Sequence, residues 1–266
     1  MDEAYQKYVE EVGRLSQPAL YPTQLKNIQE SPKFQRDESG KVEARSFPGY
    51  SVVTPPYQDD ASNEGFYHHL AQTQKRLLSQ LPQDFILPVP PASFHLTLAD
   101  LIWGDQFQSA VAKKPDFEVQ LRTQIASSFE QYQKENYASK PLQWQLLGLI
   151  IRPRAIVVGL LPKEENSYQQ LIQLRRAIYQ NQGLLSLGLE QHYHFLAHVT
   201  LGYFGKVPEA SERDEICTTL TAINDQWLEA DPKILTIDRA ELRKFSDMTS
   251  FTREPDFPAI TFGGSN

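Results

Sequence analysis

The sequence predicts an α+β protein built from two related lobes. Helical stretches alternate with short apolar runs typical of strands, and two of these runs carry the same His-x-Thr pattern about a hundred residues apart. Each motif also lies between two helical stretches, so the order of elements repeats along the chain. The duplication shows in that order and in the motifs, and not in extended residue identity.

The chain length agrees with this organisation. A chain of 266 residues can bury a substantial core either as one large domain or as two similar lobes. We treat residues 1–45 as an N-terminal extension, because residues 2–15 predict a polar helix and residues 16–49 mix Pro, Gln and Lys with little periodicity. We expect residues 46–266 to form a single bilobal domain in which each lobe carries one motif.

The first lobe begins where the pattern becomes regular. The run YSVVTPP from Tyr50 predicts a strand ended by two prolines, and a helix is expected over residues 63–81 with Asn63 as its N-cap. The apolar run of residues 86–103 follows and holds the first motif. A long helix is then expected over residues 115–137.

The second lobe repeats this plan after a predicted hairpin. Two apolar runs are separated by the turn Arg152-Pro153-Arg154, and the second motif and a last strand come later in the chain. The expected elements are strands at 142–150 and 155–161, a helix over 165–181, a strand over 194–204, a helix over 208–228 and a strand over 234–245.

The two motifs each bring a histidine and a threonine to one face of a strand. Side chains two apart in a strand point to the same side, so His95 lies beside Thr97 and His198 lies beside Thr200. The apolar residues between and after them face the opposite side. Each strand can therefore anchor itself in a core and present an imidazole and a hydroxyl to a cleft.

Two histidines and two hydroxyls suit the cleavage of a phosphodiester without a metal ion. A neutral imidazole can take a proton from an attacking water or hydroxyl, while a protonated imidazole gives one to the departing oxygen. Threonine hydroxyls can donate hydrogen bonds to the non-bridging phosphate oxygens, where negative charge gathers. The alternative interpretation is that these are ordinary strand residues that share a spacing by chance.

The first motif lies in the stretch Leu87-Pro-Val-Pro-Pro-Ala-Ser-Phe-His-Leu-Thr-Leu98, and the second in Phe195-Leu-Ala-His-Val-Thr-Leu-Gly-Tyr-Phe204. Both resemble the motifs of the 2H phosphoesterases, and the first is especially similar to that of the bacterial RNA 2′,3′-cyclic phosphodiesterases, also called 2′-5′ RNA ligases. Ala197 stands where proline often precedes the second histidine in that family.

This resemblance implies a bilobal, pseudo-twofold fold with antiparallel sheets and with helices packed outside a central cleft. It also implies that His95, Thr97, His198 and Thr200 occupy the catalytic positions. It does not account for the first 45 residues, and the chain exceeds the usual length of the compact bacterial members, which indicates a divergent branch with an open choice of substrate.

Aromatic and basic residues near the motifs are weaker candidates. Aromatic side chains can stack on a nucleobase, and Tyr203 is our candidate for a substrate-binding residue in the cleft wall. For Trp103 and Phe204 we expect core packing. Arg152 and Arg154 could bind phosphate, but arginines in a turn are more often solvated, so we leave them out of the catalytic set.

A zinc hydrolase is a less favoured alternative, suggested by His192, His194 and His198. In an extended strand, His194 and His198 lie roughly 13 Å apart, which is too far for both to bind one ion. A sharp turn after His194 would weaken this argument. We predict no metal and no cofactor.

Composition limits the partners and the compartment. With 26 basic and 33 acidic side chains the formal net charge is −7, which disfavours a broad grip on duplex nucleic acid. The lone Cys217 cannot form an internal disulfide, and no run approaches the roughly twenty apolar residues of a membrane span. We expect a cytoplasmic monomer that binds no membrane and acts on a small nucleotide or an RNA end.

The predicted function is that of a metal-independent cyclic phosphodiesterase acting on a 2′,3′-cyclic phosphate or a related small nucleotide or RNA-end diester. A non-catalytic module that binds nucleotide phosphates on the same fold is the alternative from another class. The sequence leaves open which histidine is the acid and which is the base, because the direction of substrate binding decides it.

Overall fold

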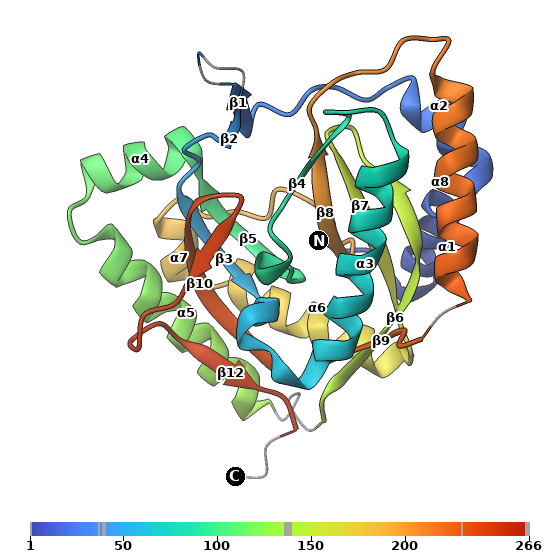
Figure 1. The fold of residues 1–266 in the computed structure, drawn as a ribbon. Coiled ribbons are helices and arrows are strands. Elements are labelled where there is room, and N and C mark those ends of the chain that lie inside the picture. Colours follow the sequence, from blue (N-terminus) through green and yellow to red (C-terminus); the bar gives the residue numbers. More distant parts are fainter. Residues whose placement is uncertain (1, 37, 39–40, 136–139, 230, 264–266) are drawn as a thin grey trace.

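Two antiparallel sheets form the centre of the molecule (Figure 1). The computed structural model describes residues 2–36, 38, 41–135, 140–229 and 231–263. The first sheet has the order β11-β10-β3-β5, with β12 also paired to β10, and the second has the order β4-β8-β7-β6-β9. The predicted α+β fold with antiparallel sheets is confirmed.

The strands of each sheet come from distant parts of the chain. The first sheet consists of β3 (Gly49–Val53), β5 (Thr97–Trp103), β10 (Arg239–Asp247), β11 (Ser250–Thr252) and β12 (Ala259–Thr261). The second consists of β4 (Ile86–Pro88), β6 (Leu142–Ile151), β7 (Ala155–Pro162), β8 (His198–Phe204) and β9 (Ile234–Ile237). A separate two-stranded hairpin consists of β1 (Phe34–Arg36) and β2 (Val42–Ala44).

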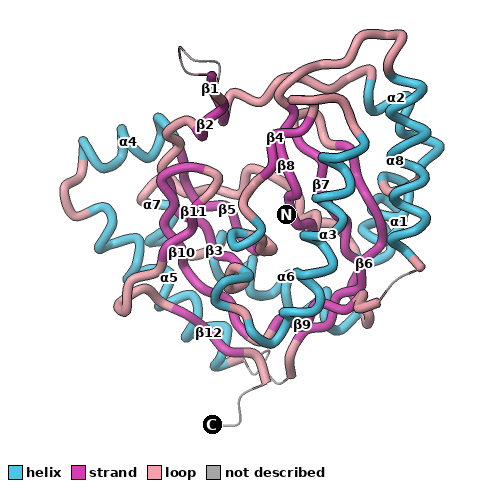
Figure 2. Tube along the Cα trace, viewed as in Figure 1, coloured by secondary structure: helices cyan, strands magenta, loops and turns pink. Residues whose placement is uncertain are grey.

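Most helices lie on the outer sides of these sheets (Figure 2). The helix α3 contacts β4 and β8, whereas α6 contacts β5 as well as β6 and β7. The helices are α1 (Tyr5–Leu15), α2 (Tyr21–Leu25), α3 (Glu64–Gln80), α4 (Gly104–Lys113), α5 (Phe117–Lys134), α6 (Glu165–Tyr179), α7 (Gln182–Ser186) and α8 (Arg213–Leu228). No helix of the described ranges is long and apolar enough to cross a membrane.

Most predicted elements are present. The strand at Tyr50, the helices over 165–181 and 208–228, and the hairpin around Arg152-Pro153-Arg154 correspond to β3, α6, α8 and the β6–β7 pair. The helix expected over 115–137 is α5, and the last predicted residues of that helix, 136 and 137, lie outside the described residues.

The prediction that Asn63 caps α3 is right about its position and wrong about its contacts. Asn63 occupies the N-cap position, but its side chain makes no cap hydrogen bond. Its amide instead bonds both backbone groups of Thr236 in β9, donating to the carbonyl and accepting from the N–H at 2.8 Å each. Asn63 therefore ties the start of α3 to the edge of the second sheet.

The single strand expected over residues 234–245 is also wrong. The chain forms two strands there, with Asp238 between them. β9 pairs with β6 in the second sheet, and β10 pairs with β3 in the first. A continuous run of β-forming residues hides this crossing, because periodicity does not report which partner a strand finds.

The N-terminal residues belong to the same core as the rest of the molecule. Tyr8, Val12, Tyr21 and Leu25 are at most 2% exposed and pack in one cluster with both sheets. The Tyr8 hydroxyl donates to the carbonyl of Leu160 in β7 at 2.8 Å. The domain boundary at residue 45 remains a prediction, but Tyr8, Val12, Tyr21 and Leu25 before it are packed in the same core as the second sheet.

A buried ion pair fastens the start of the chain to both motif regions. The Arg175 guanidinium of α6 pairs with the Asp2 carboxylate at 2.7 Å, and both side chains are at most 5% exposed. Arg175 also donates to the carbonyl of Leu98 in β5, and Asp2 accepts from the Phe195 N–H at 2.8 Å. The pair therefore links the strand of the first motif to the segment that leads into the second.

We expect Asp2→Asn to lower the free energy of unfolding by about 3 kcal/mol, because it leaves the buried Arg175 charge without a counter-charge. Urea denaturation followed by circular dichroism measures the change. Glu3→Gln is the matched control, since Glu3 pairs with the exposed Lys7 and should change stability little. Equal midpoints for Asp2→Asn and the unmodified protein would contradict this role of the pair.

Candidate active site

The two motifs meet where the two sheets approach each other. An antiparallel bridge pairs Leu96 of the first motif with Val199 of the second, outside the regular ladders of either sheet. Both side chains are fully buried. The apolar residues inside the motifs therefore form the contact between the lobes, and the polar residues beside them are turned to the other side.

The register of this bridge fixes how the polar residues lie. Continued by one residue each way, it sets His95 opposite Thr200 and Thr97 opposite His198. Opposite residues have Cβ atoms about 5 Å apart, and the diagonal pair, here the two histidines, about 7–8 Å apart. That spacing lets both rings reach one phosphate group bound between the strands.

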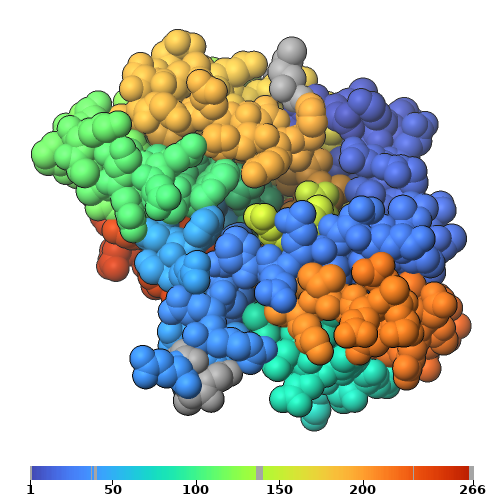
Figure 3. Space-filling view, turned by 90° about the horizontal axis from the view of Figure 1, so that it is seen from above, coloured from blue at the N-terminus to red at the C-terminus, as the bar shows by residue number. Residues whose placement is uncertain are grey.

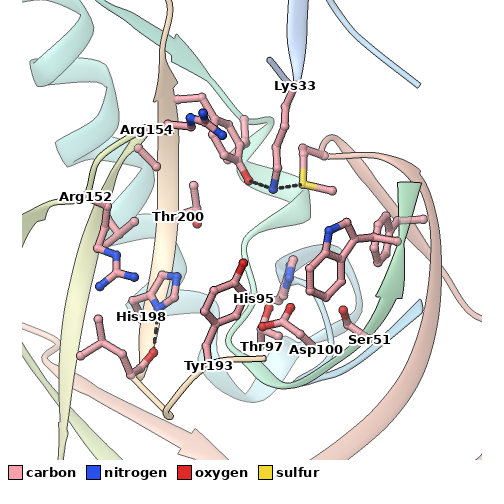
Figure 4. Close-up of a pocket in the computed structure, with 18 of the residues that line it drawn as sticks. Lys33, Ser51, His95, Thr97, Asp100, Arg152, Arg154, Tyr193, His198 and Thr200 are labelled. Carbon is pink, nitrogen blue, oxygen red and sulfur yellow. Dashed lines mark hydrogen bonds between the residues drawn. The ribbon is translucent and has the colours of Figure 1, made fainter. Parts of the chain in front are cut away.

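All the predicted site residues line one cavity of about 620 Å³. That volume lies within the usual range of small-molecule sites. Its walls include His95, Thr97, His198, Thr200 and Tyr203, each of which is partly exposed. Figure 4 shows His95 and Thr97 on one side of the pocket and His198 with Thr200 on the other.

The two imidazoles are held in the same way. His95 Nδ1 lies 2.7 Å from the carbonyl oxygen of Ser93, and His198 Nδ1 lies 2.7 Å from that of Leu196. Because a carbonyl oxygen only accepts, each Nδ1 carries the proton and donates it, which leaves Nε2 free in both rings. The sequence did not show this matched orientation, which equips both histidines for proton transfer at Nε2.

Burial lowers the pKa of both histidines to about 4. The bond from Nδ1 to a carbonyl opposes this shift in each case, while the positive charge of His198 adds to it for His95 and that of Arg152 adds to it for His198. In the empty site both rings are therefore neutral near pH 7. A bound phosphate favours the imidazolium form, so it raises these pKa values and lets one ring serve as an acid.

Bulges in the two motif strands aim further residues into the cavity. Leu201 is skipped where β8 pairs with β7, and Leu98 and Leu101 are skipped where β5 pairs with β3. Each skipped residue shifts the alternation by one, so Tyr203 follows Thr200 on the cavity face. Tyr203 lines the cavity, and its role in binding a substrate stays a prediction.

The core packing expected for Trp103 holds only in part, because the half-buried ring packs against Phe245, Met248 and Phe251 and also lines the cavity. Bulges bring Thr97, Asp100 and Trp103 to the cavity face of β5 at intervals of three residues. Trp103 stacks against the exposed Tyr193, with ring centroids 6.3 Å apart. Phe204 is fully buried, as expected. Trp144 is fully buried as well and cannot stack on a ligand.

Three basic residues line the cavity. Arg152 and Arg154 line it together with Lys33 (Figure 4). Arg154 is exposed, as expected for an arginine in a turn, whereas Arg152 is half-buried, which the sequence did not indicate. Within the described part of the chain, no carboxylate lies within ion-pair distance of these three side chains. The hairpin prediction could have located the arginines, because β7 begins directly after them and pairs with β8.

Lys33 and Asp100 were missed from the sequence. Burial lowers the pKa of Lys33 to about 8, and burial raises the pKa of Asp100 above its usual range. Asp100 follows Thr97 in the first lobe as Tyr203 follows Thr200 in the second. An acidic group thus stands in one lobe where a phenol stands in the other, which makes the pseudo-symmetric site chemically unequal.

The histidines behind the zinc alternative do not lie on an extended strand. β8 begins at His198, and the chain bends at Tyr193, so the distance argument from strand geometry does not apply to residues 192–197. His192 packs edge-on against Trp103, with centroids 4.9 Å apart. Across the residues that the structure describes, no group of three or more His, Cys, Asp or Glu is arranged to hold a metal ion.

The sequence matches no protein-family model and no curated protein. Among solved structures, a conserved protein of unknown function from Agrobacterium tumefaciens aligns with a TM-score of 0.61 at 14% identity, over 94% of this chain and 100% of that one. This likeness shows the fold.

The similar structures also include a Thermus thermophilus protein and Escherichia coli LigT, a 2H phosphoesterase. The first has a TM-score of 0.45 at 13% identity over 82% of this chain and 99% of that one. LigT, solved with 3′-AMP, has a TM-score of 0.40 at 13% identity over 83% of this chain and 100% of its own.

A nuclear magnetic resonance titration of the imidazole Cε1–H signals checks the electrostatics of the site. We expect the pKa values of His95 and His198 to lie well below 6.5 in the free protein and to rise when inorganic phosphate is added, because the anion stabilises the imidazolium. His95→Gln and His198→Gln assign the signals, and chloride at equal ionic strength is the control. Phosphate that leaves both pKa values unchanged would speak against an anion between the rings.

Proposed function

We propose that this protein is a phosphoesterase that opens a 2′,3′-cyclic phosphate, or hydrolyses a related small nucleotide or RNA-end diester, without using a metal ion. The observation that carries the proposal is the Leu96–Val199 bridge, which brings two matched His-x-Thr pairs to one cavity. The free Nε2 atoms of both rings support proton transfer on either side of a bound phosphate.

In the proposed reaction one imidazole accepts a proton from a water molecule as the water oxygen bonds to phosphorus. The bond from phosphorus to one ribose oxygen breaks, and the second imidazole, protonated in the complex, gives that oxygen its proton. The product is a phosphate monoester beside a free hydroxyl. Thr97 and Thr200 donate hydrogen bonds to the non-bridging oxygens, where charge accumulates in the transition state.

The cationic side of the cavity supports the same assignment. Arg152 is half-buried beside His198, and its charge is among the causes that lower the pKa of that ring. A guanidinium in this place can bind a phosphate oxygen and can keep His198 neutral until the anion arrives. Asp100, with its raised pKa, has no acidic counterpart in the second lobe. The two possible orientations of a bound substrate therefore differ in free energy, which favours one of them.

The proposal predicts hydrolysis of nucleoside 2′,3′-cyclic phosphates in the presence of EDTA. Replacing either proton-transfer group removes one half of the acid–base pair, so His95→Ala and His198→Ala should each lower kcat/KM by about 10²–10⁴-fold. His68→Ala is the control, because His68 is exposed on α3 and bonds only Gln72 among the described residues. Chromatography of the products measures the rate.

Two outcomes would count against the proposal. Full activity in either histidine variant would end the two-histidine mechanism. Tight binding of the cyclic nucleotides, with no product across a panel of bases, would instead favour a non-catalytic phosphate-binding module on the same fold.

A further inference from the structure

The N-terminal segment reaches into the cavity at one point. Gln29 N–H donates to the carbonyl of Pro153 at 2.7 Å, and Ser31 N–H donates to that of Phe204 at 2.8 Å. These backbone bonds hold the segment against the ends of the β6–β7 hairpin and of β8. Figure 3 shows the blue N-terminal residues lying across this face of the molecule. The bonds of Gln29 and Ser31 therefore hold the backbone just before Lys33 beside the cavity.

Among the described residues no carboxylate lies within ion-pair distance of the Lys33 ammonium, although Asp100 of the same cavity is near enough to oppose the lowering of its pKa. The ammonium lies 4.8 Å from the ring centroid of Phe47 and 5.1 Å from that of Tyr203, and it contacts the Tyr203 hydroxyl at 3.5 Å and the Met248 sulfur at 3.1 Å. These contacts position the cation but do not neutralise it.

Arg154 adds a second cation to the same end of the cavity. Its guanidinium donates to the neutral amide oxygen of Gln29 at 3.2 Å, and its charge helps to lower the pKa of Lys33. By contrast, the buried Arg175 and Arg243 are paired, the first with Asp2 and the second with Glu241. Carboxylates therefore neutralise Arg175 and Arg243, whereas Lys33 and Arg154 line one cavity with no ion-pair partner among the described residues.

Two cations near one another at a cavity repel, and an anion bound between them turns that repulsion into two charge-assisted contacts. We propose that Lys33 and Arg154, on either side of Tyr203, form a second phosphate subsite. Tyr203 lies three residues beyond Thr200, or roughly 10 Å along β8, so this subsite is separate from the phosphate position between the two histidines.

The proposal deepens the proposed function, on which it rests, by specifying the substrate class. The substrate carries a second phosphate besides the cyclic diester that is opened. That phosphate is either a 5′-phosphate on the same nucleoside or the internucleotide diester of an RNA end, and both present the same anionic oxygens to Lys33. Lys33 is a specificity-determining residue in this account and does not take part in proton transfer.

The test compares three cyclic phosphates: adenosine 2′,3′-cyclic phosphate, its 5′-phosphorylated form, and a dinucleotide that ends in the cyclic phosphate. We expect kcat/KM to be about tenfold or more higher for at least one of the two substrates with a second phosphate, in keeping with one charge-assisted contact. Which of the two is preferred identifies the source of the phosphate. Equal values for all three would overturn the subsite.

Variants then assign the preference to the cations. Lys33→Gln should reduce the ratio between the preferred substrate and the plain cyclic nucleotide to near one, and Arg154→Gln should reduce it in part. Lys26→Gln, which removes an exposed lysine from the same segment, should leave the ratio unchanged. A ratio that survives Lys33→Gln would contradict the proposal.

A binding measurement separates this inference from the reaction itself. Calorimetry with adenosine 3′-phosphate and adenosine 3′,5′-bisphosphate needs no turnover, and the bisphosphate should bind about tenfold more tightly only when Lys33 is present. If no cyclic phosphate is opened, the proposed function fails while this comparison still decides the subsite. If the cyclic phosphates are opened but the bisphosphate shows no advantage, the subsite fails alone.

Discussion

One short contact between two sheets organises the cavity. Leu96 and Val199 pair across the lobes with both side chains fully buried, so any shift of one residue would turn apolar side chains toward solvent and bury polar ones. The same register that hides these two residues sets a histidine opposite a threonine on each side of the bridge. The register that buries these two apolar side chains therefore also fixes the arrangement of the candidate catalytic groups.

A buried ion pair holds the two motif segments together, and bulges in the motif strands add further side chains to the cavity. Arg175 connects the Leu98 carbonyl to Asp2, and Asp2 holds the backbone of Phe195, so both motif strands depend on one buried ion pair. The bulges in β5 and β8 then add Asp100 and Tyr203 to the face that already carries the motifs. A strand of strict alternation would have sent those side chains into the core.

Sequence reasoning reached the fold class, most of the elements and the four motif residues, because period and motif are local properties of the chain. It failed where long-range pairing decides the outcome. The run from Ile234 to Phe245 divides between two sheets, and Asp100 faces the cavity because a bulge, which leaves no clear pattern in the sequence, shifts its side. Lys33 lay in a segment without periodicity, and only backbone bonds to distant strands place it at the cavity.

The central claim is that both imidazoles act on one phosphate, and a crystal structure with bound phosphate or vanadate tests it most directly. The account predicts a single anion within hydrogen-bond distance, about 2.6–3.2 Å, of Nε2 of both His95 and His198, with Thr97 and Thr200 on its other oxygens. An anion bound to one histidine alone, with the second ring turned away from it, would contradict the account.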